Sequence, residues 1–133
     1  MYLLDTNVVS EARRGSPEAT AWIRSVKGRP LHVSVITLGE TMRGVELKQR
    51  KDPKAAAVLA EWLIALRELH RDTVLPVTEA IALEWGRLAA ERSRNTADGL
   101  IAATARVHDL ILVTRNVADF EDAGVSVINP WDL

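Results

Sequence analysis

Two spacings of apolar residues alternate along this chain of 133 residues. Short runs of consecutive apolar residues are typical of strands buried on both faces, and longer segments with apolar side chains every three or four positions are typical of amphipathic helices. The runs predict strands at residues 2–5, 31–35, 73–77, 110–114 and 125–129, and the longer segments predict helices at 8–14, 17–26, 37–49, 52–69, 78–90, 96–108 and 117–122. This alternation predicts an α/β fold with a short, mainly parallel sheet that helices cover on both faces.

Residues that favour helix N-termini support several of these boundaries. Ser16 and Asp52 each precede a proline, which is the arrangement of an N-cap followed by proline in the first turn. The segment Thr37-Leu-Gly-Glu40 matches a capping box, so Thr37 is expected to begin the third helix.

The segment 52–69 carries the longest apolar stripe in the chain. Its members at helical spacing are Val58, Leu59, Trp62, Leu63, Leu66 and Leu69. Together with the helix that follows Thr37, this stripe offers more apolar surface than one face of a short sheet needs. Two arrangements are therefore open: the two helices pack within the core, or they project as a pair that binds a partner or a second subunit.

The composition is that of an ordinary globular protein, with 47% apolar and 26% charged residues, and the length fits a single domain, residues 1–133. The absence of cysteine excludes disulfides and thiolate zinc sites, and the three histidines are too far apart in sequence to match a metal-binding motif. No apolar run is long enough to span a bilayer, and no signal peptide is recognised, so a cytoplasmic protein without membrane contact is expected. The net charge of −1 gives no global sign of nucleic-acid binding, so any such surface must be local.

Four acidic residues are placed where the predicted strands end. Asp5 ends the first strand, Glu40 lies in the first turn after the second, and Asp119 follows the strand at 110–114. Asp98 opens the helix that leads into that strand, so it lies at the same edge of the sheet. Because the carboxyl ends of parallel strands meet at one edge, where such folds bind ligands, the four side chains are expected to converge.

Each of these residues also has a simpler structural explanation. A side-chain oxygen at a helix N-terminus caps unpaired N–H groups, and the helix dipole favours a negative charge there. Capping does not require the four residues to be neighbours, however, and adjacent carboxylates repel one another unless a cation lies between them. Mg²⁺ or Mn²⁺ is the cation expected at such a cluster, because it prefers oxygen ligands and keeps waters that a phosphate substrate can replace.

Four spaced motifs also resemble one known family. The segments "LLDTNVVSE", "SVIT" followed by Glu40, "TADGLIAATA" and "LVTRNVADF" are similar to those of the PIN-domain ribonucleases, specifically the VapC toxins of type II toxin–antitoxin systems. The ending "VINPWDL" resembles the Fit-type branch of that group. The resemblance covers the whole chain and implies a PIN-like three-layer α/β/α sandwich. It also implies a toxin that hydrolyses RNA phosphodiester bonds with Mg²⁺, or with Mn²⁺ in its place.

The resemblance also assigns roles by position. Asp5 and Asp98 match the aspartates that bind the metal most directly, Glu40 matches the third acidic residue, and Asn116 with Asp119 matches a variable fourth position. Many relatives have an aspartate where this chain has Asn116, and a neutral amide is a weaker metal ligand, which leaves a second metal in doubt. The catalytic set implied is therefore Asp5, Glu40, Asp98 and Asp119, with the metal held by Asp5, Asp98 and Glu40.

Neighbouring polar residues are expected to have supporting roles. The hydroxyl groups of Thr6 and Thr114 and the amide of Asn116 could orient a ligand carboxylate or a phosphate oxygen. Arg115 is a candidate contact to an RNA phosphate, and simple solvation of an exposed arginine is the competing interpretation.

The partners implied by the resemblance are a small VapB-like antitoxin and an RNA substrate, either transfer RNA or ribosomal RNA. A homodimer within the toxin–antitoxin complex, and operator DNA bound through the antitoxin, are also implied. Two other Mg²⁺-dependent classes, phosphoacceptor receiver domains and haloacid dehalogenase-type phosphatases, need a lysine late in the chain, and no lysine follows Lys54. The remaining alternative is a catalytically inactive PIN-fold module that binds RNA or protein, and Asn116 is its best support.

Overall fold

The structure is a computed structural model that describes all residues from 1 to 133. Its strands are β1 (Tyr2–Leu4), β2 (Leu31–Ser34), β3 (Val74–Leu75), β4 (Ile111–Val113) and β5 (Val127–Ile128). Its α-helices are α1 (Thr6–Arg13), α2 (Pro17–Ser25), α3 (Val35–Gln49), α4 (Pro53–Leu69), α5 (Glu79–Glu91) and α6 (Thr96–His108), and two short 3₁₀ helices are η1 (Val117–Phe120) and η2 (Pro130–Asp132). None of the helices is long and apolar enough to cross a membrane.

The strands form one sheet in the order β3-β2-β1-β4-β5, and every neighbouring pair is parallel. The predicted mainly parallel sheet is confirmed, and the carboxyl ends of all five strands lie at one edge. The first strand of the chain occupies the centre: Tyr2 pairs with Leu31 of β2 on one side and with Ile111 of β4 on the other.

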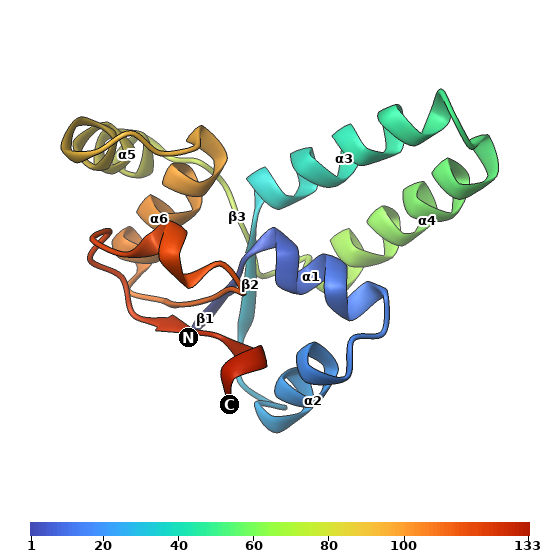
Figure 1. Cartoon of the computed structure of the whole chain (residues 1–133), viewed down its shortest axis with the longest axis horizontal. Coiled ribbons are helices and arrows are strands. Elements are labelled where there is room, and N and C mark those ends of the chain that lie inside the picture. The colour runs from blue at the N-terminus through green and yellow to red at the C-terminus, as the bar shows by residue number, and fades with distance from the viewer.

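Helices cover both faces of the sheet because its central strand is apolar throughout. Leu3 packs among buried side chains of α5 and α6, whereas Tyr2 and Leu4 pack on the opposite face with α1, α2 and α4. Figure 1 shows these two helical layers on either side of the strands. The predicted three-layer α/β/α sandwich is therefore confirmed.

Most of the helix starts follow the predicted caps. Ser16 and Asp52 accept hydrogen bonds from backbone N–H groups of α2 and α4. The capping box at Thr37 is wrong, because Ser34 caps α3 through its hydroxyl and the helix begins at Val35. Thr37 is instead buried inside the first turns of α3, and Glu40 lies in the second turn rather than the first.

Helices α3 and α4 form an antiparallel pair that extends away from the sheet, as Figure 1 shows. Only part of the predicted apolar stripe of α4 is buried: Leu59, Leu63 and Leu66 are covered, whereas Val58 is 60% and Leu69 is 79% exposed. The stripe is therefore narrower than predicted, since the neighbouring helix covers one side of α4 and leaves the flanking positions in solvent.

Candidate active site

A polar cleft of about 320 Å³ lies at the carboxyl edge of the sheet, and no apolar side chain lines it. Its lining residues are Asp5, Thr6, Asn7, Ser10, Glu11, Arg14, Glu40, Asp98 and Asn116. The structure thus brings together three of the four predicted acidic residues, from β1, α3 and α6. It adds a fourth carboxylate, Glu11, that sequence reasoning missed.

Asp5 is fixed at the junction of β1 and α1. Its backbone N–H donates to the carbonyl of Val113 (2.9 Å), which continues the pairing of β1 with β4. Its carboxylate Oδ1 accepts from the N–H of Thr6 (2.8 Å), and Oδ2 accepts from the hydroxyl of Thr114 (2.8 Å). The residue therefore acts as the N-cap of α1 as well as a wall of the cleft, so the capping interpretation and the functional one are both compatible with its position.

Burial raises the pKa of the Asp5 carboxyl from 3.8 to about 6. The bonds from Thr114 and Thr6 act in the opposite direction, and the charges of Asp98 and Glu40 add to the rise. Only 4% of Asp5 is exposed, so loss of hydration outweighs the hydrogen bonds. A bound cation would favour the ionised form of this carboxylate and would lower its pKa again.

Asn7 links the two strand ends, and the sequence analysis assigned it no role. Its amide Nδ2 donates to Thr114 Oγ1 (3.2 Å) and lies 3.3 Å from Asp5 Oδ2, and its Oδ1 accepts from the N–H of Arg115 (3.2 Å). Thr114, which is fully buried, also accepts from the N–H of Asn116 (3.0 Å). These bonds orient Asp5 from the side of β4, and the supporting role of Thr114 stays a prediction.

Two threonine hydroxyl groups, joined by a hydrogen bond, hold the Glu40 carboxylate at the cleft. The Thr6 hydroxyl donates to Glu40 Oε1 (2.6 Å) and lies 2.9 Å from Thr37 Oγ1. A carboxylate can only accept, so the proton of Thr6 is directed to Glu40 and Thr37 is the donor to Thr6. The buried Thr37 thus anchors an otherwise exposed carboxylate, which explains why this residue points inward instead of capping its helix.

Asp98 lies in the first turn of α6, as predicted. Asn95 caps this helix by accepting from the Asp98 N–H (3.2 Å). Burial raises the pKa of the Asp98 carboxyl, and the charges of Asp119 and Glu40 raise it further. The next residue, Gly99, is buried, and a Cβ there would lie 2.9 Å from Trp85 Cδ1. Glycine therefore allows α5 and α6 to approach closely just beside the acidic residue.

Asp119 is placed outside the lining of the cleft. It is exposed on η1, although it is close enough for its charge to raise the pKa of Asp98. Asn116 does line the cleft, but its side chain makes no capping bond to η1.

Arg115 is exposed but turned away from the carboxylates. Its guanidinium lies over the ring of Trp131 (4.8 Å to the centroid), and it is not among the residues that line the cleft. An arginine stacked in this way keeps its edge N–H groups free for a phosphate, so the predicted contact stays a prediction.

The carboxylates do not form a complete metal-binding group by themselves. No three acidic or histidine side chains are close enough to ligate one metal ion together. Glu40 accepts a hydrogen bond from Thr6, and Asp5 accepts one from Thr114, so an oxygen of each carboxylate already has a donor from the protein. Mg²⁺ is commonly held by only one or two protein carboxylates, with waters and substrate phosphates as its other ligands. Asp5 and Asp98 therefore fit such an ion as donors, and the oxygen-only lining fits its chemistry.

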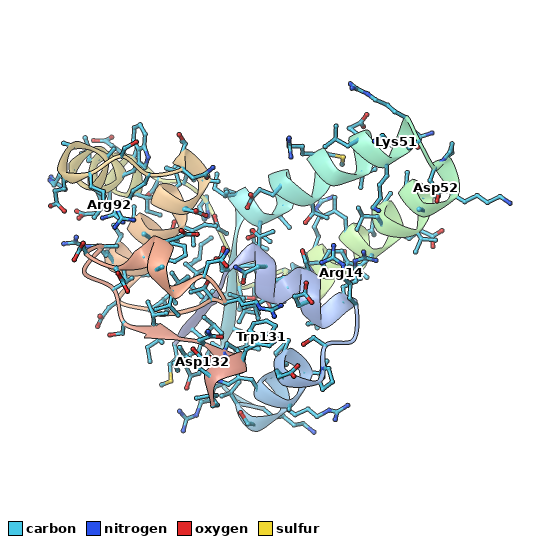
Figure 2. All side chains as sticks on the ribbon, viewed as in Figure 1. Arg14, Lys51, Asp52, Arg92, Trp131 and Asp132 are labelled. Carbon is cyan, nitrogen blue, oxygen red and sulfur yellow. The ribbon has the colours of Figure 1, made fainter.

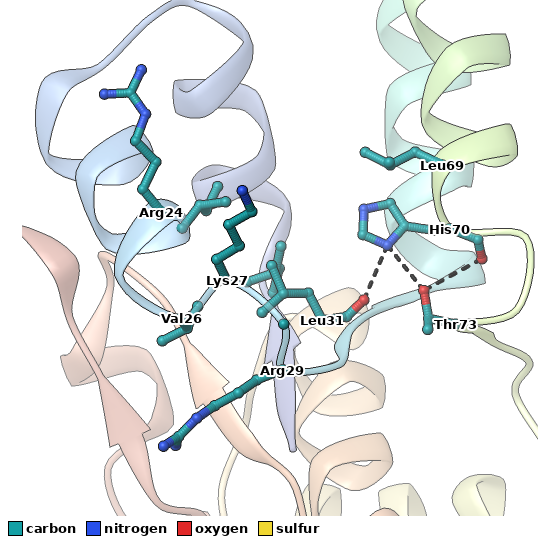
Figure 3. Close-up of a pocket in the computed structure, with 11 residues that line it drawn as sticks. Arg24, Val26, Lys27, Arg29, Leu31, Leu69, His70 and Thr73 are labelled. Carbon is teal, nitrogen blue, oxygen red and sulfur yellow. Dashed lines mark hydrogen bonds between the residues drawn. The ribbon is translucent and has the colours of Figure 1, made fainter.

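A larger cavity of about 580 Å³ lies elsewhere, between α2, the beginning of β2 and the C-terminal end of α4 (Figure 3). Five of its eleven lining residues are apolar, and it contains no carboxylate. Its buried histidine, His70, donates from Nδ1 to the Leu31 carbonyl (3.0 Å), and burial lowers its pKa. This cavity has no acidic side chain that could hold a metal ion, so it is not the candidate active site.

Comparison with known proteins agrees with the chemistry of the polar cleft. The PIN domain family model matches residues 2–125. Toxin FitB of Neisseria gonorrhoeae is 36% identical to this chain over 98% of it and 99% of the relative, and VapC ribonuclease Y4jK of Sinorhizobium fredii is 33% identical over 99% of each. A solved structure of FitAB bound to an IR36 DNA fragment matches with a TM-score of 0.87 and 35% identity, covering 100% of this chain and 97% of that one. The chain belongs to the PIN-domain family, within the group that contains the VapC and FitB toxins.

Proposed function

We propose that this protein is the toxin of a type II toxin–antitoxin system and that it acts as a metal-dependent endoribonuclease. The observation that carries the proposal is the convergence of Asp5, Glu40 and Asp98 on one cleft, with the pKa of Asp5 and of Asp98 raised mainly by burial. Perturbed carboxyl groups in a polar cleft are typical of catalytic sites. The names of the relatives, a toxin and a ribonuclease, support the same function.

Nucleases of the PIN-domain family generally use divalent metal ions. We propose Mg²⁺ as the ion here, with Mn²⁺ as a substitute, and Asp5 and Asp98 as the residues that hold it. When bound, such an ion polarises the scissile phosphate and lowers the pKa of a water that attacks it. Two donors and a surrounding of waters suit the arrangement at this edge of the sheet better than a closed three-carboxylate cage.

The protein residues around these donors have separate tasks in the proposal. Glu40, oriented by the Thr6 hydroxyl, accepts a proton from the attacking water or holds that water in line with the scissile bond. Thr114 and Asn7 keep the Asp5 carboxylate in one orientation. Asp119 acts from outside the cleft by adding negative charge near Asp98. No covalent enzyme intermediate is required.

The proposed partners follow from the same relatives. A small VapB-like antitoxin would cover the cleft, and a homodimer of toxins would bind operator DNA through the antitoxin, as the FitAB complex on a DNA fragment suggests. The RNA substrate is proposed to be a transfer RNA or a ribosomal RNA, and the protein is proposed to act in the cytoplasm, where both are found.

A second candidate function is an inactive PIN-fold module that binds RNA or protein. Two observations favour it: Asn116 places a neutral amide where an acidic ligand would strengthen the site, and no three carboxylates form a ready metal-binding group. The acidic residues retained at positions 5, 40 and 98 favour the nuclease instead.

An assay of total bacterial RNA cleavage by antitoxin-free protein distinguishes the nuclease from the inactive binding module. The reaction is run with Mg²⁺, with Mn²⁺ and with chelator, and the parent protein is compared with Asp5→Asn and with Asp72→Asn, an exposed acidic residue remote from the cleft. The nuclease predicts metal-dependent cuts by the parent and by Asp72→Asn that disappear in Asp5→Asn. A folded parent that binds RNA but cuts none would favour the binding module.

A further inference from the structure

The polar cleft is lined by one positively charged side chain, Arg14, that the proposed function does not use. Four carboxylates line it, at positions 5, 11, 40 and 98, and Arg14 is the only positively charged side chain among its lining residues. An RNA strand is an anion along its whole backbone, and a single divalent ion leaves most of this negative charge uncompensated. A substrate bound here therefore needs a second positive contact from the protein.

The position of Arg14 is set by the helix that begins at Asp5. Four residues that line the cleft share one face of α1, because the last three lie three, four and seven positions after the first. They are Asn7, Ser10, Glu11 and Arg14. Arg14 is the C-cap of this helix, whereas Asp5 is its N-cap. The two caps are nine positions apart, which corresponds to about 14 Å along the helix axis.

Glu11 orients the Arg14 side chain but leaves most of its N–H donors free. Glu11 Oε1 lies 3.0 Å from Arg14 Nη1, which uses one of the five guanidinium donors. The Arg14 side chain remains 59% exposed, against 28% for Glu11, and an ion pair as open as this contributes little to stability. Figure 2 labels Arg14 at the end of α1.

We propose that Arg14 binds a backbone phosphate of the RNA one or two nucleotides from the scissile bond, through the donors that Glu11 leaves free. The inference rests on the proposed nuclease function and adds the direction of the strand, which would run along the polar face of α1 from Asp5 toward Arg14. The planar guanidinium suits two parallel bonds to phosphate oxygens, and its distance from Asp5 places it beside a neighbouring nucleotide rather than at the bond that breaks.

The chain offers a matched control at Arg71. Arg71 pairs with Glu68 at the same spacing of three residues, also just after the end of a helix, but it does not line the cleft. Arg14→Gln and Arg71→Gln therefore remove the same charge and the same kind of ion pair from two different places. Arg14→Lys keeps the charge and removes the planar fork.

The test measures binding of a fluorescein-labelled single-stranded RNA in the Asp5→Asn background, so that the RNA stays intact, at several salt concentrations. Arg14→Gln is expected to weaken binding about tenfold and to reduce the slope of log affinity against log salt by about 0.7, as the loss of one phosphate contact requires. Arg71→Gln is expected to leave both nearly unchanged, and Arg14→Lys to retain the slope with part of the affinity. Equal binding and equal slopes for the glutamine variants would overturn the proposal.

Cleavage kinetics of variants that retain Asp5 test the role of Arg14 independently of the proposed nuclease function. If the parent cuts RNA, Arg14→Gln should lower kcat/KM about tenfold mainly through a higher KM, because a flanking contact contributes to binding. Metal-dependent cleavage that Arg14→Gln leaves unaffected would refute the role of Arg14 and retain the nuclease. RNA binding that depends on Arg14 in a protein that never cuts would refute the nuclease and retain the contact, and a parent that neither binds nor cuts would refute both.

Discussion

The polar cleft and the larger cavity beside His70 differ in chemistry in a way that their volumes do not show. The larger one, beside His70, is lined partly by apolar side chains and carries three cationic residues on its rim, Arg24, Lys27 and Arg29. The smaller one is wholly polar and carries four carboxylates. The smaller cavity also contains both carboxyl groups with raised pKa values. Chemistry, rather than volume, therefore identifies the candidate active site.

The difference follows from the direction of the strands. The polar cleft lies where β1 and β4 end, so the loops and helix N-termini that follow them supply side chains with free oxygens. The larger cavity lies where β2 begins and where α2 and α4 end, so it is lined by residues that close the core. Substitutions at one cavity should therefore change catalysis, and substitutions at the other should not.

The largest expected effect is the loss of activity in Asp98→Asn. Removing one of two proposed metal donors should lower the cleavage rate at least about 100-fold, because a bound metal contributes several kcal/mol to the transition state. The variant should also melt at a higher temperature than the parent without metal, since repulsion is relieved, and should gain nothing from Mg²⁺. Melting curves with and without Mg²⁺ check this, and equal responses of variant and parent would exclude a metal site at Asp98.

The next effect is expected in the free energy of unfolding, which should depend on pH through Asp5. Asp5 binds its proton with a pKa of about 6 when folded and 3.8 when unfolded, so the folded state holds more protons between these values. The free energy of unfolding should therefore fall by about 3 kcal/mol as the pH rises from 4 to above 6 in chelator. Urea unfolding across this range should show that decrease in the parent and in Asp72→Asn. A decrease of the same size in Asp5→Asn would contradict the assignment.

The close approach of α5 and α6 gives the next prediction. Gly99→Ala should destabilise the protein by about 1–3 kcal/mol, because the new Cβ would lie 2.9 Å from Trp85 Cδ1, and either the Trp85 ring or one of the two helices must shift. The shift would also displace Asp98 and slow cleavage. Gly86→Ala is the matched control, since nothing lies within 4 Å of its added Cβ and alanine favours a helix. Urea unfolding of both variants checks the difference, and a stabilised Gly99→Ala would show that the contact is not tight.

The smallest effect is expected at the larger cavity. The double variant Arg24→Gln, Lys27→Gln should leave RNA cleavage unchanged and shift the free energy of unfolding by no more than about 0.5 kcal/mol, because both side chains are exposed and make no ion pair. Cleavage assays and urea unfolding against the parent check both statements. A large loss of cleavage would show that the two cavities are coupled.

Much of the site could be predicted from strand direction alone. Once the strands are parallel, residues that follow them must share an edge, and this argument places Asp5, Glu40 and Asp98 together whatever the details of the helices. It is incomplete for Asp119, which does not line the cleft although its charge reaches Asp98. It also misses Arg14, although the polar positions at 7, 10, 11 and 14 are a periodic signal on one helix face.

The errors in local structure come from competition between similar motifs. Thr37 and Glu40 have the spacing of a capping box, but Ser34 lies three residues earlier and ends a strand, so it caps the helix first. Thr37 then becomes a buried donor to Thr6, a contact between residues 31 positions apart that no local rule describes. The same holds for Arg115, whose stacking on Trp131 depends on the fold of the C-terminal segment.

The central position of β1 has a consequence for synthesis. This strand is synthesised before β4, yet it pairs with β4, whose first residue lies 109 positions after its partner Tyr2, and a strand of three residues is not stable unpaired. Until Thr114 has been translated, Asp5 lacks its buried hydroxyl donor and the wall that β4 provides. A nascent chain that has not yet reached Thr114 therefore lacks a complete cleft, and the side chains that line it come together only after β4 has been synthesised.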